Sequence, residues 1–169
     1  MSNETRLTPT SYIVLGLLAA AGESTPYDLK RGVAASLGNF WSLQHAQLYT
    51  EPERLTSAGY LSDRREDGGR RRKHYKITAK GRKALREWLA EPTEELTELR
   101  DPGLLKIFFG ADPRTLADGQ LQAHRGKLTE YEEILERAGA DLPAGVRLSL
   151  EAGVGHEREW VRFWSQLAG

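Results

Sequence analysis

A run of cationic side chains follows a turn sequence in the middle of the chain. Arg70, Arg71, Arg72 and Lys73 come directly after Asp67-Gly68-Gly69. Asp-Gly and Gly-Gly supply the positive φ angles that hairpin turns require, and the flanking segments 60–66 and 72–77 have the length of short strands. The sequence therefore predicts a β-hairpin whose tip carries four positive charges, suited to bind DNA phosphates or to enter the minor groove.

Polar side chains precede this hairpin in a segment where the spacing of Leu48, Leu55 and Ala58 predicts a helix that ends at Gly59. The N-terminal part of such a recognition helix is the end that faces base edges in a DNA groove. Glutamine can bond an adenine edge through two hydrogen bonds. The candidate DNA-contacting residues of this part of the helix are Gln44, His45, Gln47, Tyr49 and Thr50.

Charge is distributed unevenly along the chain, although 24 Lys and Arg balance 24 Asp and Glu overall. Residues 1–92 hold 15 cations and 10 acids, whereas residues 93–169 hold 9 and 14. An excess of cations in the first part of the chain is typical of a protein that binds a polyanion such as DNA. The alternative is that these charges form only a solvated surface. Because the densest cations coincide with a hairpin tip, we expect double-stranded DNA as the partner.

Three further helices are needed to position the hairpin and the recognition helix. Thr8-Pro9 and Thr25-Pro26 each supply an N-cap followed by proline at the first helical position, so a helix should start at each. Another helix should start at Thr78 and end at Glu91-Pro92, the expected domain boundary. Its apolar face is expected to hold Leu85, Trp88 and Leu89.

This order of elements, with four short motifs, resembles the DNA-binding domain of the PadR family of bacterial transcriptional regulators. The motifs are Leu15-Gly16-Leu17-Leu18 with Tyr27-Asp28-Leu29-Lys30-Arg31, Gln47-Leu48-Tyr49 with Arg54-Leu55 and Ala58-Gly59, Gly69-Arg70 with Tyr75, and Ile77-Thr78 with Lys80-Gly81. The resemblance covers residues 1–90. It implies a winged helix-turn-helix fold, and it implies repression as the physiological result of DNA binding.

The sequence departs from the family pattern at two places. Thr25-Pro26 stands where the family often has His-Gly, and Pro52 stands where the family often has an apolar residue after the tyrosine of the recognition helix. An interior proline removes one helical hydrogen bond and usually bends the axis. We therefore expect a bend near Leu48–Pro52 that changes how the recognition helix enters a groove.

Two long amphipathic helices are expected in the second half of the chain, from the Asp112-Pro113 cap to about residue 138 and from about 144 to 167. Leu121, Leu128 and Leu135 repeat every seven residues in the first of them. Association with a second chain would bury this repeat, and the alternative is a self-contained helical hairpin packed on the first domain. The family resemblance implies a homodimer through these helices, which would read an inverted repeat with half-sites ~34–36 Å apart.

The predicted fold is therefore mostly α with a minor β component. A winged helix-turn-helix domain spans residues 1–92, and a helical antiparallel dimerisation domain spans 93–169. The chain also holds four tryptophans, Trp41, Trp88, Trp160 and Trp164. They could line a pocket for a small hydrophobic or aromatic effector, as some PadR-like proteins have, or they could simply be core and interface residues.

Other classes of function lack a supporting pattern. The absence of cysteine excludes disulfides, zinc fingers and iron–sulfur clusters, and the four histidines are isolated from one another, so neither a metal nor another cofactor is expected. No nucleophile motif of the Gly-x-Ser-x-Gly kind occurs, so an enzyme is not expected. No apolar run approaches the ~20 residues of a membrane span and no signal peptide is recognisable, which favours the cytoplasm.

One alternative function stays open at this point. The winged fold could serve as a protein-interaction adaptor without specific DNA binding. Retention on heparin and salt-sensitive binding to duplex DNA separate the two, because an adaptor need not show either.

Overall fold

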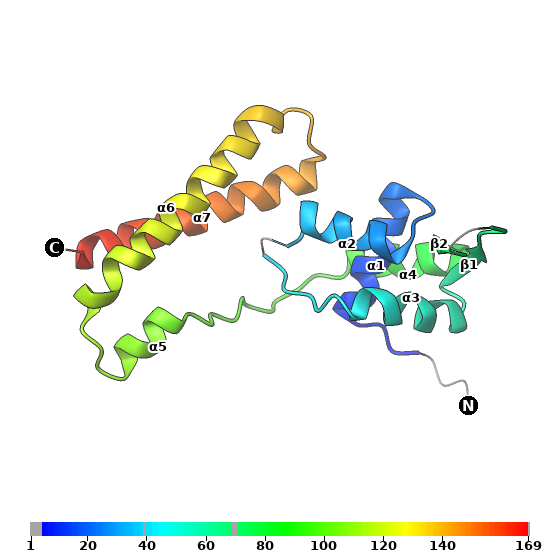
Figure 1. Cartoon of the computed structure of the whole chain (residues 1–169), viewed down its shortest axis with the longest axis horizontal. Coiled ribbons are helices and arrows are strands. Elements are labelled where there is room, and N and C mark those ends of the chain that lie inside the picture. Colours follow the sequence, from blue (N-terminus) through cyan, green and yellow to red (C-terminus); the bar gives the residue numbers. More distant parts are fainter. Residues whose placement is uncertain (1–4, 39, 69–70, 169) are drawn as a thin grey trace. The chain divides into compact units, whose positions relative to one another are not determined.

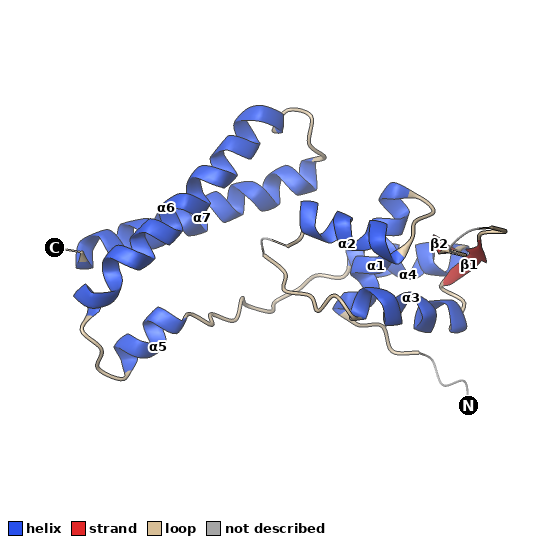
Figure 2. Cartoon of the chain, viewed as in Figure 1, coloured by secondary structure: helices blue, strands red, loops and turns tan. Residues whose placement is uncertain are grey.

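The structure is a computed structural model that describes residues 5–38, 40–68 and 71–168. Contacts divide the chain into two compact units, Met1–Glu94 and Glu95–Gly169. The first unit is helical with one small two-stranded sheet, and the described residues of the second form helices and loops (Figure 2). This composition confirms the mostly α fold class with a minor β component.

The first unit follows the predicted order of three helices, two strands and a further helix (Figure 1). Its elements are α1 (Pro9–Ala21), α2 (Pro26–Ala35), α3 (Gln47–Ser57), β1 (Leu61–Arg65), β2 (Lys73–Ile77) and α4 (Ala79–Ala90).

The starts of three of these helices are fixed by threonine side chains. Thr8 and Thr25 each accept a hydrogen bond from the backbone N–H three residues further on, in capping boxes completed by Ser11 and Asp28. Thr78 caps α4 by accepting a bond from the N–H three residues further on. The predicted N-caps are therefore confirmed.

The predicted hairpin is also present. Its strands pair antiparallel, from Leu61 opposite Ile77 to Arg65 opposite Lys73. Each strand is one or two residues shorter than the segment expected from the sequence. The base of the hairpin is buried against the unit through Leu61 and Ile77, whereas Arg65, Arg71 and Arg72, further along, are exposed.

The turn of the hairpin differs in detail from the expected glycine turn. The backbone N–H of Glu66 donates to the carbonyl of Arg72 at 3.1 Å and closes the end of the strands. Within the described part of the turn, the positive φ of 45° falls on Arg71 and not on Gly68. Gly69 and Arg70 lie outside the described residues, so the conformations expected for them stay predictions.

The core of the first unit joins its three N-terminal helices to the base of the hairpin. Fully buried side chains come from α1 and α3, namely Val14, Leu15, Leu18, Leu48 and Leu55. The start of α4 approaches this core at Gly81, where an added Cβ would lie 2.3 Å from the carbonyl oxygen of Tyr60. Only a glycine fits this close contact.

The predicted apolar face of α4 is partly wrong. Leu85 is buried, and Trp88 stacks on Tyr12 of α1 with ring centroids 4.5 Å apart. Leu89 is 67% exposed, because it belongs to the last turn of α4, beyond the buried core.

The second unit is built on a hairpin of two long helices, α6 (Pro113–Ala138) and α7 (Ala144–Leu167), which lie side by side and antiparallel (Figure 1). A short helix, α5 (Pro102–Phe108), precedes them. The bounds of α6 and α7 confirm those predicted from the sequence. The two long helices approach closely at Gly153 of α7, where an added Cβ would lie 2.9 Å from the ring of Tyr131 on α6.

Trp164 occupies the centre of the packing at one end of this helix pair. It is fully buried and packs with Ala117 and Leu121, and its ring contacts Gly103 of α5. The first leucine of the heptad repeat is thus buried within the chain's own hairpin and does not need a second chain to cover it. Most of the large exposed apolar side chains of this unit lie in and around α5, and two lie at the start of α7: Leu96, Leu99, Leu105, Phe108, Phe109, Val146 and Leu148.

Candidate nucleic-acid interface

The recognition helix α3 starts later than the sequence suggested. It begins at Gln47, with Ala46 as an N-cap whose side chain makes no capping hydrogen bond. Gln44 and His45 therefore precede the helix, and the prediction that they belong to its N-terminal part is wrong. Their backbone carbonyls accept bonds from the N–H groups of Gln47 and Leu48, at 2.9 and 3.1 Å, and so lead the chain into α3.

The other three candidates are in the expected place. Gln47, Tyr49 and Thr50 occupy the first turn of α3 and are all exposed, with half of the Tyr49 surface open to solvent. Exposed polar and aromatic side chains at the start of a recognition helix can reach base edges and phosphates. Whether each one touches DNA stays a prediction.

Pro52 lies inside α3 and is fully buried. It has no N–H to donate to the carbonyl four residues before it, so this turn of the helix is one hydrogen bond short. The bend expected near this residue stays a prediction. What the structure adds is a set of side-chain contacts at the same turn, made by Glu51 and Arg54 to α1.

The cations of the hairpin have different surroundings. Arg71 and Arg72 are exposed, and among the described residues neither forms an ion pair. Lys73 lies at the turn-side end of β2, opposite Arg65, and its ammonium group is 3.3 Å from the carboxylates of both Glu53 of α3 and Asp63 of β1. Burial acts to lower the pKa of Lys73, but the bonds to these two carboxylates more than offset it, so the pKa is raised.

Strand β1 adds cations that the sequence analysis did not single out. Arg65 is exposed at the end of β1, and the guanidinium of Arg64 donates to Glu23 at 2.7 Å. His74 of β2 bonds Glu66 at 2.8 Å, and this bond is the chief cause that lowers the pKa of Glu66. Alternation along the strand places Arg65 on the same face as the buried Leu61, so this pattern alone would not have marked Arg65 as a solvent-facing cation.

The four tryptophans do not share one environment. Trp164 is core and Trp88 stacks on Tyr12, whereas Trp41 is 42% exposed in the loop before α3. Trp160 of α7 is half-buried, and its indole N–H donates to Nε2 of His156 at 2.8 Å. For Trp164 the core interpretation holds; an effector pocket formed by the others stays a prediction.

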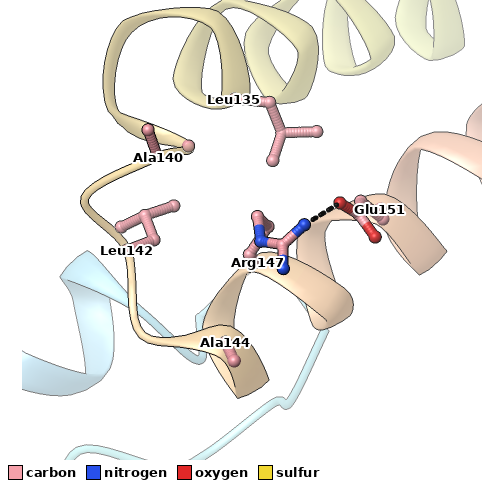
Figure 3. Close-up of a pocket in the computed structure, with 7 residues that line it drawn as sticks. Leu135, Ala140, Leu142, Ala144, Arg147 and Glu151 are labelled. Carbon is pink, nitrogen blue, oxygen red and sulfur yellow. Dashed lines mark hydrogen bonds and ion pairs between the residues drawn. The ribbon is translucent and has the colours of Figure 1, made fainter.

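The described part of the second unit has a hollow of about 440 Å³ where α6 turns into α7 (Figure 3). Leu135, Ala140 and Leu142 form its apolar side. Arg147 and Glu151 face it from α7 and are paired with each other at 3.2 Å. No tryptophan lines this hollow.

The described residues show neither a candidate metal site nor a candidate membrane span. Within ranges 5–38, 40–68 and 71–168, no cluster of three His, Asp or Glu side chains could hold a metal ion. Over the same ranges, no helix has the length and apolar character required to cross a membrane.

Comparisons with known proteins agree with this geometry in both units. Residues 14–87 match the model of the transcriptional regulator PadR-like family, and residues 99–168 match the model called virulence activator alpha C-term. The chain is 31% identical over 138 residues to the negative transcriptional regulator PadR of Bacillus subtilis (strain 168), a match that covers 75% of each chain.

Solved structures of the Bacillus subtilis protein extend the similarity to nearly the whole chain. Its complex with operator DNA is 26% identical and superposes with a TM-score of 0.85, covering 97% of this chain and 98% of that one. Its complex with p-coumaric acid is also 26% identical, with a TM-score of 0.78 and coverage of 94% and 95%.

Proposed function

Because the chain belongs to the PadR-like family of transcriptional regulators, we propose that it binds operator DNA as a homodimer and represses transcription. The observation that carries this proposal is the pairing of α3, with its exposed polar first turn, with a hairpin whose Arg71 and Arg72 are exposed and free of ion pairs among the described residues. Repression rather than activation follows from the likeness to a negative regulator.

In this proposal α3 and the hairpin contact different parts of the DNA. Gln47 on α3 reads base edges in the major groove, since glutamine can form two hydrogen bonds to adenine. Tyr49 and Thr50 contact the sugar-phosphate backbone or adjacent bases. Arg71 and Arg72 bind phosphates or the minor groove, which adds affinity but little sequence information.

The second unit supplies the dimer in this proposal. Phe108 and Phe109, at the end of α5, are 82% and 78% exposed, and Leu105 one turn earlier is 60% exposed. A cluster of large exposed apolar side chains marks a contact surface, and a second copy of the chain would cover it. Two α3 helices related by a twofold axis would then read half-sites about one helical turn, ~34–36 Å, apart.

We also propose that a small aromatic or hydrophobic molecule releases the protein from DNA. The Bacillus subtilis relative has been crystallised with p-coumaric acid, a small aromatic acid. Trp41 and Trp88 are each about two-fifths exposed, and although one face of Trp88 is covered by Tyr12, the exposed parts of both rings are aromatic surface against which such a molecule can pack. A regulator of this kind acts in the cytoplasm, where the DNA is, and has no catalytic role.

Selection of duplex DNA from a random pool tests the proposed function. The full chain should enrich an inverted repeat, bind it with a steep dependence on salt, and release it when p-coumaric acid is added as a probe. A single enriched half-site would argue against the homodimer. Failure to enrich any sequence, with no retention on heparin, would favour the protein-interaction adaptor instead.

A further inference from the structure

A closed hydrogen-bonded network ties the recognition helix to α1. Ser11 of α1 is fully buried, and its hydroxyl donates to Oε1 of Glu51 on α3 at 2.5 Å. Arg54, three residues further along α3, donates from Nη2 to the same carboxylate oxygen at 2.6 Å and to the Ser11 hydroxyl at 2.9 Å. Its Nε also donates to Oε2 of Glu51, at 2.9 Å.

The same network reaches the segment that precedes α1. Arg54 donates from Nη1 to the backbone carbonyl of Arg6 at 3.1 Å, and the backbone N–H of Thr8 donates to the Ser11 hydroxyl at 2.8 Å. The Ser11 oxygen therefore donates one bond and accepts two, which uses its full hydrogen-bonding capacity. A network satisfied to this degree holds its members in one arrangement.

The network sits at the turn of α3 where Pro52 removes a helical hydrogen bond. Glu51 directly precedes Pro52, which cannot donate to the carbonyl of Leu48. The exposed candidates Gln47 and Tyr49 lie on the N-terminal side of this turn. With one backbone bond missing, the direction of that first turn depends more heavily on the side chains that attach it to α1.

We infer that Ser11, Glu51 and Arg54 are positioning residues for sequence recognition, which set the direction in which Gln47 and Tyr49 project toward the DNA bases. This inference rests on the proposed function. Ser11 is fully buried, and the Glu51 side chain is 12% exposed. The Arg54 side chain is 37% exposed, but its guanidinium nitrogens donate to Glu51, Ser11 and the Arg6 carbonyl. A purely structural network would instead support the fold without affecting which bases are preferred.

A change in base preference distinguishes a positioning role for this network from a purely structural one. The full-length protein and its variants should be titrated with the selected operator and with a panel of single-base variants of it. Ser11→Ala removes the hydrogen bonds that join α1 to Glu51 and Arg54, and also the capping bond from the Thr8 N–H, but it leaves the Glu51–Arg54 pair. Glu51→Gln leaves the cap of α1 in place and keeps the volume of the side chain but removes its charge. Each should reduce the ratio between preferred and mismatched affinities, by on the order of tenfold at the most strongly discriminated position.

Ser57→Ala is the matched control, because its exposed hydroxyl bonds only the helix's own Glu53 carbonyl, at 3.0 Å. This variant should keep the ratio of the unmodified protein. If the ratio is unchanged in both Ser11→Ala and Glu51→Gln while all affinities fall by one factor, the network is only structural and the inference is wrong. If Ser11→Ala does not fold, Glu51→Gln decides alone. An unmodified protein without base preference would overturn the proposed function and this inference with it.

Discussion

The ammonium group of Lys73, at the turn-side end of the hairpin, lies 3.3 Å from the carboxylate of Glu53 on the recognition helix. Asp63 of β1 lies at the same distance on the neighbouring strand. The lysine also sits 5.5 Å from the centre of the Tyr75 ring. Lys73 thus joins both strands of the hairpin to α3, and much of its charge is already balanced within the protein.

The salt dependence of DNA binding should distinguish Lys73 from the arginines beside it. Each phosphate contact releases counterions, so its loss lowers the slope of log K against log salt by about 0.9. Arg71→Ala plus Arg72→Ala should therefore lower the slope by roughly one to two and weaken all sequences alike. Lys73→Ala should lower it less, because this cation is paired with two carboxylates.

The control for this measurement is Arg137→Ala, which removes an exposed cation of α6 that is paired with Glu133. Its slope should match that of the unmodified protein. A double arginine variant with altered base preference and an unchanged slope would mean that the hairpin reads bases, contrary to the assignment made here.

Gln47 and Tyr49 should differ in what their substitution does to recognition. Gln47→Ala should relax the preference at one position of each half-site, by ~1–3 kcal/mol, because a bidentate contact to a base edge is lost. Tyr49→Phe should weaken binding to every sequence by a similar factor, since a phosphate contact carries no sequence information. Titrations against the operator and its single-base variants check both. Selective losses for Tyr49→Phe with uniform losses for Gln47→Ala would reverse these roles.

Local signals in the sequence were sufficient to predict most of the fold. Four helix starts could be recognised without tertiary information, because each depends on a side chain that bonds the backbone a few residues further on. They are the N-caps Thr8, Thr25, Thr78 and Asp112. The hairpin was likewise recognisable from two short strand-like segments on either side of a turn sequence, and these segments pair as expected. These elements formed where the sequence indicated.

The features that were missed depend on contacts between distant segments. Trp164 shows the same helical spacing whether it faces a pocket or a core, and only its packing against Ala117 and Leu121 identifies it as core. The start of α3 was misplaced because Ala46 is an N-cap that makes no side-chain bond and leaves no mark in the sequence. The Ser11–Glu51 bond joins residues 40 positions apart, which no local pattern predicts.

Gly81 should be intolerant of even one added methyl group. In Gly81→Ala the new Cβ would meet the Tyr60 carbonyl at 2.3 Å and Ile77 at 2.8 Å, so α4 must shift from the core. We expect a loss of about 1–3 kcal/mol in the free energy of unfolding. Gly16→Ala in α1, where nothing lies within 4 Å, is the comparison and should gain up to about 1 kcal/mol. Denaturant unfolding measures both, and equal losses would contradict the close contact.

The exposed end of α5 should be required for self-association. Phe108→Asp places a charge on a side chain that is 82% exposed in the single chain, so it should leave the fold intact but separate the two copies of a dimer. Light scattering should then report a monomer at micromolar concentration, with weaker binding to the inverted repeat. Lys106→Ala, at a polar exposed position of the same helix, should remain a dimer. A dimeric Phe108→Asp protein would place the interface elsewhere.

The Glu51 carboxylate should make the stability of the protein depend on pH. Burial raises its pKa, but hydrogen bonds from Arg54 and Ser11 more than offset this, so the pKa in the folded protein is lowered. The resulting stabilisation is present above the pKa of the unfolded chain, about 4.3, and is lost as pH falls through the folded value. The unmodified protein should therefore exceed Glu51→Gln in free energy of unfolding at pH 7, and this difference should shrink toward pH 3.

Glu87→Gln, whose side chain is 63% exposed, provides the comparison and should show only a small difference at either pH. Urea titrations at the two pH values measure these differences, and a Glu51→Gln difference that stays constant would show that the network does not depend on the charge of Glu51.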